Sequence, residues 1–232
     1  MKLSWSEILL KGHRTFPHVP WAAEGRWQPK PSSFLILIFG LSVFGVGEGL
    51  FYLSRLGNSP WVVLAEGLSK LSGLNVGTVT ALISVTVLAV WIPLRERPGL
   101  GTVMNIILIA AVLEITIDHI PLAVGTTMQV TYTISGLLLV GLGSALYLTT
   151  KLGPGPRDGL MTGLTRRTGR QIWQVRTAIE IVVGVIGFAL GGTFGFGTIW
   201  FALTIGPQVQ FWLHRVDREG RAIRQTTAAA RD

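Results

Sequence analysis

Cysteine is absent from this chain of 232 residues, and charged residues are scarce. Without cysteine the chain forms no disulfide, no thiolate metal site and no cysteine nucleophile. Charged residues make up 14% of the sequence, whereas soluble globular domains carry about 25%. Because 49% of the residues are hydrophobic, the composition predicts a membrane protein.

Motifs of catalysis and cofactor binding are also missing. The sequence contains no nucleophile elbow, phosphate-binding loop, zinc motif or dinucleotide fingerprint. His119 and His214 lie at the ends of apolar runs, without a second histidine at metal-ligand spacing. The net charge is +8, but the basic residues flank the apolar runs, a placement typical of membrane orientation. We therefore predict no enzyme, no cofactor, no metal site and no nucleic-acid partner.

Long apolar runs dominate what is present. A helix needs about 20 mostly apolar residues to cross a bilayer, and six segments approach that length: 34–53, 74–94, 101–118, 130–150, 172–190 and 197–213. Another apolar segment, 60–71, is too brief to span, since twelve residues extend only about 18 Å. It predicts a half-helix or an interfacial helix.

The first 33 residues are more polar. Residues 1–15 lack the long apolar core and cleavage site of a signal peptide. Ser4 and Glu7 there fit a capping box that opens a short helix. Residues 16–33 contain four prolines and two tryptophans, which favours a linker along the lipid headgroups.

Connections rich in lysine and arginine alternate along the chain with connections that are poor in them. Lysine and arginine are frequent in the basic segments 1–33, 95–97, 151–170 and 215–224. The intervening connections hold few or none: Arg55 and Lys70 lie in 54–73, and 119–129 and 191–196 have no lysine or arginine. Positive charge marks the cytoplasmic side. The pattern predicts a multi-pass protein of the bacterial inner membrane with both termini in the cytoplasm.

A shift of 96 residues aligns the two halves of the chain, laying Pro60 on Pro156 and Thr102 on Thr198. Each unit holds three spans, so the second copy enters from the opposite side. We predict an all-α membrane protein of six transmembrane helices in two inverted three-helix repeats, each with a short half-helix after its first span. The expected segments are an N-terminal segment 1–33, repeats 34–118 and 130–213, an external connection 119–129 and a basic tail 214–232.

Two stretches carry a family resemblance: LSRLGNSPWVVLAEGLSKLSGLNVGTVT and GLGTVMNIILIAAVLEITIDHIP. Their pattern combines a leucine-glycine pair, a proline-tryptophan pair and spaced glycines with Asn105 and Asp118. Over residues 35–215 the chain resembles the bacterial YczE family of membrane proteins, relatives of the YitT-like group. The resemblance implies a membrane fold and location. It carries no molecular activity over to this chain.

The two junctions between loop and half-helix are candidate substrate or gating sites. Ser59 and Gly155 stand at predicted N-cap positions, each followed by a proline. Helix N-termini favour anions, and half-helices entering from opposite faces would bring theirs together. The candidate residues are Asn58, Ser59, Pro60, Trp61, Pro156, Arg157 and Asp158. The alternative is a pair of interfacial helices with ordinary caps, in which Trp61 anchors the chain at the interface.

Ionisable residues inside spans are candidate proton or ion coupling sites, because buried charge is costly in a membrane. Glu48 lies deep in the first span without a partner in its own helix. Glu114 and Asp118 share one helix face and repel unless a proton or cation sits between them. Alternatively, Asp118 simply lies at the external interface. Arg176 and Glu180, four residues apart, are expected to pair with each other.

Together these features favour a small secondary transporter or exporter with inverted repeats. Its expected partners are the lipid bilayer and a small-molecule or ion substrate. The alternative is a non-transport scaffold, or a regulatory partner of another membrane or cell-envelope system. The two differ in whether water reaches the middle of the molecule.

Overall fold

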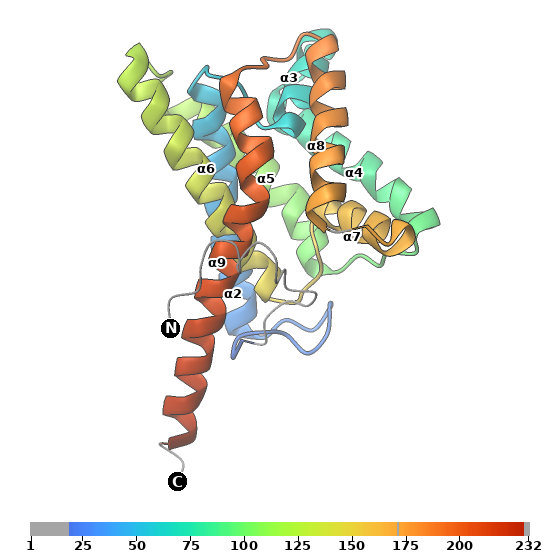
Figure 1. Cartoon of the computed structure of the whole chain (residues 1–232), viewed down its shortest axis with the longest axis vertical. Helices are drawn as coiled ribbons and strands as arrows, with labels where there is room; N and C mark the ends of the chain where they lie inside the picture. Colours follow the sequence, from blue (N-terminus) through green and yellow to red (C-terminus); the bar gives the residue numbers. More distant parts are fainter. Residues whose placement is uncertain (1–18, 171, 230–232) are drawn as a thin grey trace.

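The computed structural model describes residues 19–170 and 172–229, with side chains described over 19–170 and 174–216. The short helix predicted at residues 1–15 lies outside the described residues, as do most side chains of the basic tail. The described chain forms eight helices and no strand (Figure 1): α2 (Pro31–Leu53), α3 (Pro60–Ser72), α4 (Val76–Leu94), α5 (Leu100–His119), α6 (Gly125–Thr149), α7 (Pro156–Thr168), α8 (Ile172–Ala189) and α9 (Phe196–Ala229).

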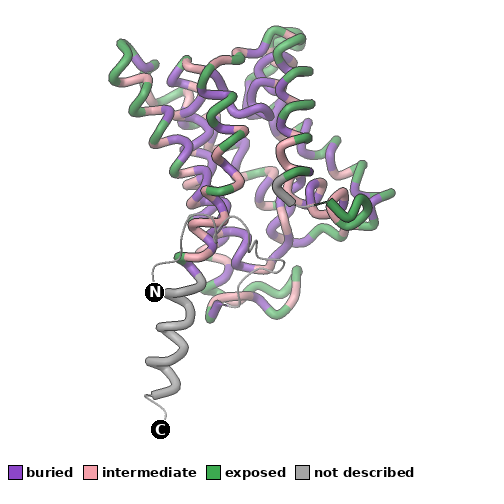
Figure 2. Tube along the Cα trace, in the orientation of Figure 1, coloured by how far each residue is buried: buried purple, intermediate pink, exposed green. Residues whose placement is uncertain are grey.

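Four helices of the described chain, α2, α4, α5 and α6, are long and apolar enough to cross a membrane. The helices α8 and α9 occupy the places predicted for the fifth and sixth spans. Large apolar side chains point away from the protein on several helices, including Leu35, Ile92 and Phe188. Figure 2 shows exposed residues along the outer faces of the helices and buried residues where helices meet. The chain is thus a multi-pass helical membrane protein.

The helices α3 and α7 have 13 residues each, about 20 Å at 1.5 Å per residue. Each is too short to span, which confirms the short helix predicted at 60–71. Both begin with a proline and end at a left-handed glycine, Gly73 with φ 72° and Gly169 with φ 67°. Proline suits the first helical position and glycine the position after the last. The sequence therefore determines where both helices begin and end, through a proline at the start and a glycine after the end.

Backbone features recur at the shift of 96 residues found in the sequence. Arg55 and Lys151 have φ of 61° and 59°, and Gly57 and Gly153 both have φ of 114°. The amide of Gly101 donates to the carbonyl of Leu152 at 2.8 Å, and the amide of Gly197 donates to that of Leu56 at 2.8 Å. Each hydrogen bond joins the loop after the first helix of one half to the fourth helix of the other half, α5 or α9.

The helices α2 and α6 pack against each other through glycines. They run in opposite directions, α2 upward and α6 downward in Figure 1. A Cβ atom on Gly47 would lie 2.8 Å from the Gly136 carbonyl oxygen, and one on Gly136 would lie 2.7 Å from that of Gly47. Gly40 and Gly143 face each other in the same way. Small residues of this kind let membrane helices approach backbone to backbone.

Each short helix packs on a helix of the other half, α3 on α8 and α7 on α4. A Cβ atom on Gly187 of α8 would lie 2.7 Å from the Val63 carbonyl carbon, and one on Gly159 of α7 would lie 2.0 Å from the Trp91 ring. Val63 and Gly159 occupy matching positions in the two halves, as do Trp91 and Gly187. In both contacts a glycine packs tightly on the other helix, against the backbone of α3 in one case and against the Trp91 ring in the other.

Candidate functional site

Five ionisable residues gather where α2, α7 and α8 meet: Glu48, Arg157, Asp158, Arg176 and Glu180. Glu48 is 1% exposed and Glu180 is 4% exposed. Charges removed from water cost several kcal/mol each unless they are paired and hydrogen-bonded. The partners of each group therefore decide what the cluster can do.

Glu48 is held by two donors from two different helix starts. The Ser59 hydroxyl donates to its Oε2 at 2.5 Å, and Arg157 Nη1 donates to its Oε1 at 3.4 Å. The predicted N-cap position of Ser59 is confirmed, but its hydroxyl makes no capping bond. The residue stands at the N-cap position, but the carboxylate on the neighbouring helix is the stronger acceptor.

Trp61 lies beneath Arg157. The guanidinium carbon of Arg157 is 5.1 Å from the centre of the Trp61 ring, a distance typical of a cation–π contact. Trp61 is only 4% exposed, so the alternative of an interface anchor is wrong. The tryptophan instead forms part of the wall of the central cluster.

Asp158 accepts a hydrogen bond from the Tyr147 hydroxyl, and its Oδ1 lies 3.8 Å from Arg176 Nη1. The ion pair of Arg176 within 4 Å is thus with Asp158, while Glu180 interacts with Arg176 through charge alone. The start of α7 packs against α8, which places Asp158 beside Arg176. A partner supplied by packing replaces the neighbour one turn along the helix.

Glu180 interacts with the charges of Arg176 and Arg157 but forms no close ion pair with either. Its Oε2 is buried and accepts no hydrogen bond, and no ion pair to it occurs among the described residues. It lines a cavity of about 30 Å³ together with Glu48, Trp61, Arg157 and Arg176, enough for one or two water molecules. The Arg176 Nε is likewise buried without a partner.

A second cavity of about 20 Å³ lies next to the same two α7 residues. Arg157, Asp158 and Phe44 line both cavities. The remaining wall of the second cavity is neutral and polar, formed by Thr80, Ser84 and Asn105 with two isoleucines. These three positions match Arg176, Glu180 and Phe201 of the first cavity under the 96-residue shift. The two cavities are thus lined by matching parts of the two halves.

Asn58 lies outside this centre although it is 2% exposed. Its Nδ2 donates to Glu66 Oε2 at 2.7 Å. Glu66 also accepts from the backbone and hydroxyl of Thr193, both at 2.8 Å, and pairs with Lys70 at 2.9 Å. Burial alone would raise the pKa of the Glu66 carboxyl, but the bonds from Lys70 and Thr193 outweigh it and lower the pKa below its usual range. This network fixes the outer end of α3.

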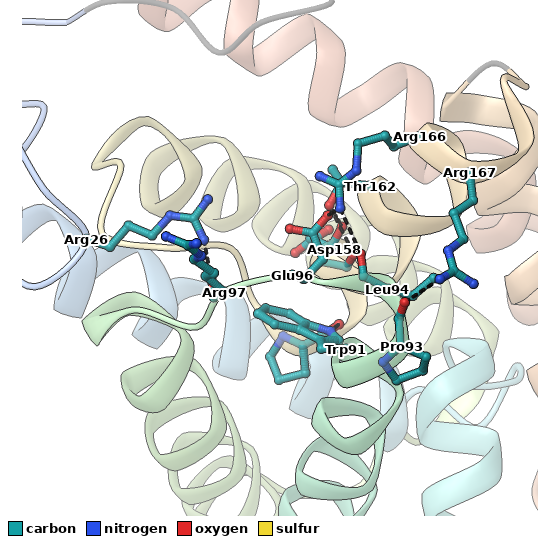
Figure 3. Close-up of polar contacts among 12 residues, drawn as sticks. Arg26, Trp91, Pro93, Leu94, Glu96, Arg97, Asp158, Thr162, Arg166 and Arg167 are labelled. Carbon is teal, nitrogen blue, oxygen red and sulfur yellow. Dashed lines mark hydrogen bonds and ion pairs between the residues drawn. The ribbon is translucent and has the colours of Figure 1, made fainter.

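Sequence reasoning missed Glu66, whose partner Thr193 lies 127 residues away. A matching arrangement surrounds α7 (Figure 3). There Arg166 pairs with Glu96 at 3.0 Å and donates to the Leu94 carbonyl at 2.8 Å. Lys70 and Arg166 stand at matching positions, so a basic side chain ties each short helix to a turn of the other half.

The remaining candidates have local roles. Pro60 and Pro156 begin α3 and α7, and the Pro156 carbonyl accepts from Trp91 Nε1 at 3.0 Å. Glu114 Oε2 accepts from the Gly77 amide at 2.7 Å and so caps the start of α4. Asp118 is exposed near the end of α5. Neither acid lines either central cavity.

Comparison with known proteins gives one family and several relatives. Residues 31–214 match a family of unknown function, DUF6198. An uncharacterized protein of Haemophilus influenzae is 44% identical over 205 residues, which cover 88% of this chain and 94% of the relative. The uncharacterized membrane protein YczE of Bacillus subtilis is 29% identical over 208 residues, 89% of this chain and 94% of the relative.

A second Bacillus subtilis protein, the uncharacterized protein YyaS, is 32% identical over 187 residues. That similarity covers 77% of this chain and 91% of the relative. No solved structure matches the chain. The descriptions of these relatives name no activity, so a function for this chain has to be inferred from the geometry of the central cluster.

Proposed function

Because this chain belongs to the DUF6198 family of unknown function, we propose its activity from its own geometry: it is a small secondary transporter or exporter. The similarity to YczE confirms the resemblance carried by its motifs. One observation carries the proposal. Five ionisable residues are packed together between helices of a membrane protein, where each charge is costly.

The proposed architecture has six spans in two inverted repeats, residues 34–118 and 130–213, with both termini in the cytoplasm. Three observations support it: the matched ends of α3 and α7, the reciprocal bonds of Gly101 and Gly197, and the opposite directions of α2 and α6. The alternation of basic residues between connections supports the orientation. Inverted repeats with substrate sites between them are common in secondary transporters.

The substrate path is proposed to pass between the two cavities. Arg157 and Asp158 line both, so the start of α7 separates them. The ion pair of Arg157 with Glu48 and that of Asp158 with Arg176 hold this divider in place. Breaking the two ion pairs would let the start of α7 move and the cavities join. Transport requires such a movement. The present arrangement then corresponds to a closed, occluded state.

A specific observation favours the scaffold alternative. The cavities of about 20 and 30 Å³ hold only a water molecule or two. A protein that never opens could keep such polar pockets for helix pairing alone. The alternatives differ in whether reagents dissolved in water can reach these pockets.

Single cysteines in this cysteine-free chain test the difference. Ser84→Cys places a thiol in one cavity and Met161→Cys places one in the other. A small hydrophilic thiol reagent should label both in a transporter, each faster from its own side of the membrane. Ala145→Cys, buried away from both cavities, is the matched control and should stay unlabelled. If neither cavity thiol reacts faster than this control, transport is contradicted and the scaffold is favoured.

A further inference from the structure

We propose that the carboxyl group of Glu180 is the proton-binding group of the central site. The inference deepens the proposed transport function and rests on it for the coupling role, although the protonation itself can be measured without transport. The sequence directed attention to Glu48, Glu114 and Asp118 for this role. The contacts of the four acids separate Glu180 from the other three.

Hydrogen bonding distinguishes the buried acids. Glu48 accepts from Ser59 and Arg157, and Asp158 accepts from Tyr147 and pairs with Arg176. These are the donors that an ionised carboxylate requires when it leaves water. Glu180 Oε2 is buried with no donor. A protonated carboxyl group avoids the cost of an unpaired charge.

The charges of the cluster lead to the same conclusion. Arg157 and Arg176 supply two positive charges, and Glu48, Asp158 and Glu180 supply three carboxyl groups. The Tyr147 hydroxyl is the further titratable group, contributed by α6. Trp61 of α3 and Phe201 of α9 complete the wall without charge. One proton makes the cluster neutral, and Glu180 is the carboxyl whose Oε2 has no donor and to which neither arginine forms a close ion pair.

The two halves carry a glutamate at different members of two matching pairs of positions, 48 with 144 and 84 with 180. Glu48 in the first half matches Ser144 in the second, and Ser84 in the first half matches Glu180 in the second. Ser84 donates to the carbonyl of Thr80 at 2.9 Å and needs no further partner. The acid of the first half is therefore committed to the ion pair with Arg157, and that of the second half is free to exchange a proton.

The cavity is large enough for one or two water molecules, which would provide the route for that exchange. The cavity of about 30 Å³ touches both Glu180 and the Arg157–Glu48 pair. When Glu180 releases its proton to this water, its O–H bond breaks. The resulting carboxylate then attracts Arg176 or Arg157 in competition with their present partners. Protonation of Glu180 and the ion pairs that separate the cavities are thereby linked.

Infrared spectroscopy of the full chain in lipid tests the proposal. The wild type should show the carbonyl stretch of a protonated carboxyl group at neutral pH. Glu180→Gln should remove this band and Glu180→Asp should shift it. Glu66→Gln is the control, because Glu66 holds Lys70 and should leave the band unchanged. Absence of the band from the wild type, or its persistence in Glu180→Gln, would overturn the proposal.

Thermal unfolding gives a second readout. Glutamine resembles a protonated glutamate, so Glu180→Gln should unfold at the wild-type temperature or higher. A clear drop would show that Glu180 is an ionised partner of an arginine, contrary to the proposal. Neither readout requires transport. If the cavity thiols fail to label but the band behaves as expected, the proton site stands and the proposed transport function fails.

Discussion

The starts of α3 and α7 occupy matching positions yet serve the central site differently. At α3, Ser59 donates to Glu48 of its own half and Trp61 forms an aromatic wall. At α7, Gly155 replaces the serine, and Arg157 replaces the tryptophan and reaches Glu48 in the other half. The two halves thus contribute complementary parts to one site instead of two equal sites.

Several glycines of α2, α6 and the loops that follow them, in contrast, recur at the same positions in both halves. The glycines of α2 and α6 face each other in two equivalent pairs, and Gly57 and Gly153 have the same φ of 114°. Close backbone contact tolerates no side chain at such places. A polar side chain at a central position has no equivalent constraint, so the two halves can differ there. The comparison separates residues that hold the fold from residues that give the site its chemistry.

The largest effect is expected from breaking the central ion pair. Glu48→Gln leaves Arg157 as a buried charge without its carboxylate, which should cost about 3–5 kcal/mol of folding stability. Thermal unfolding in lipid measures the loss. The double variant Glu48→Gln/Arg157→Gln removes both charges and should recover most of it. If the double variant is as unstable as the sum of the single variants, the pair contributes no coupling energy.

A smaller effect is expected where Gly159 packs against the Trp91 ring. Gly159→Val installs the residue found at the matching position 63, and its side chain would overlap the Trp91 ring. Overpacking of this kind costs about 1–3 kcal/mol, and this contact should lie near the upper end. Adding Trp91→Gly removes the ring that the new side chain would overlap and should restore part of the stability. An additive double variant would show that the overlap with Trp91 is not the cause of the loss.

Substitution of either of two glycines by alanine should lower the folding stability by a similar amount. Gly57→Ala and Gly153→Ala each place a Cβ atom on a residue with φ of 114°, near atoms of the other half at 2.7 and 3.0 Å. Each should cost about 1–3 kcal/mol from backbone strain, with the Gly57 variant slightly worse. Unfolding temperatures of the two variants measure this. A large drop for one variant and none for the other would show that the two loops are not equivalent.

The smallest effect concerns the pH dependence at the outer end of α3. The pKa of Glu66 is lowered in the folded protein, so its contribution is fully present above the usual carboxyl pKa of about 4.3 and is lost as pH falls through the folded value. Because Lys70 is half exposed, the effect should stay below about 1 kcal/mol. Glu66→Gln should flatten this part of the stability profile. Thr162→Val, at the matching position of α7, should retain it.

The sequence predicted the short helices from local signals such as Ser59-Pro60. It also predicted that Glu48, a charge within an apolar run, lies deep in its helix, and the residue is 1% exposed. It did not predict which donor each acid would find. The Ser59 hydroxyl donates to Glu48 instead of capping α3, and the close ion pair of Arg176 is with Asp158. Spacing along one helix identifies neighbours on that helix only. Partners from the other half depend on packing, which is also why Glu66 and Thr193 were missed.

The most direct test of the inverted architecture uses the outer ends of α3 and α7. Ser72 and Thr168 are exposed, stand at matching positions and each bond a carbonyl four residues earlier. Ser72→Cys and Thr168→Cys, each in the cysteine-free chain, would be treated with a membrane-impermeant thiol reagent on sealed cells and on inverted vesicles. The account predicts that Ser72→Cys is labelled only from outside and Thr168→Cys only from the cytoplasm. Labelling of both from the same side would contradict the inverted repeat and the central site built on it.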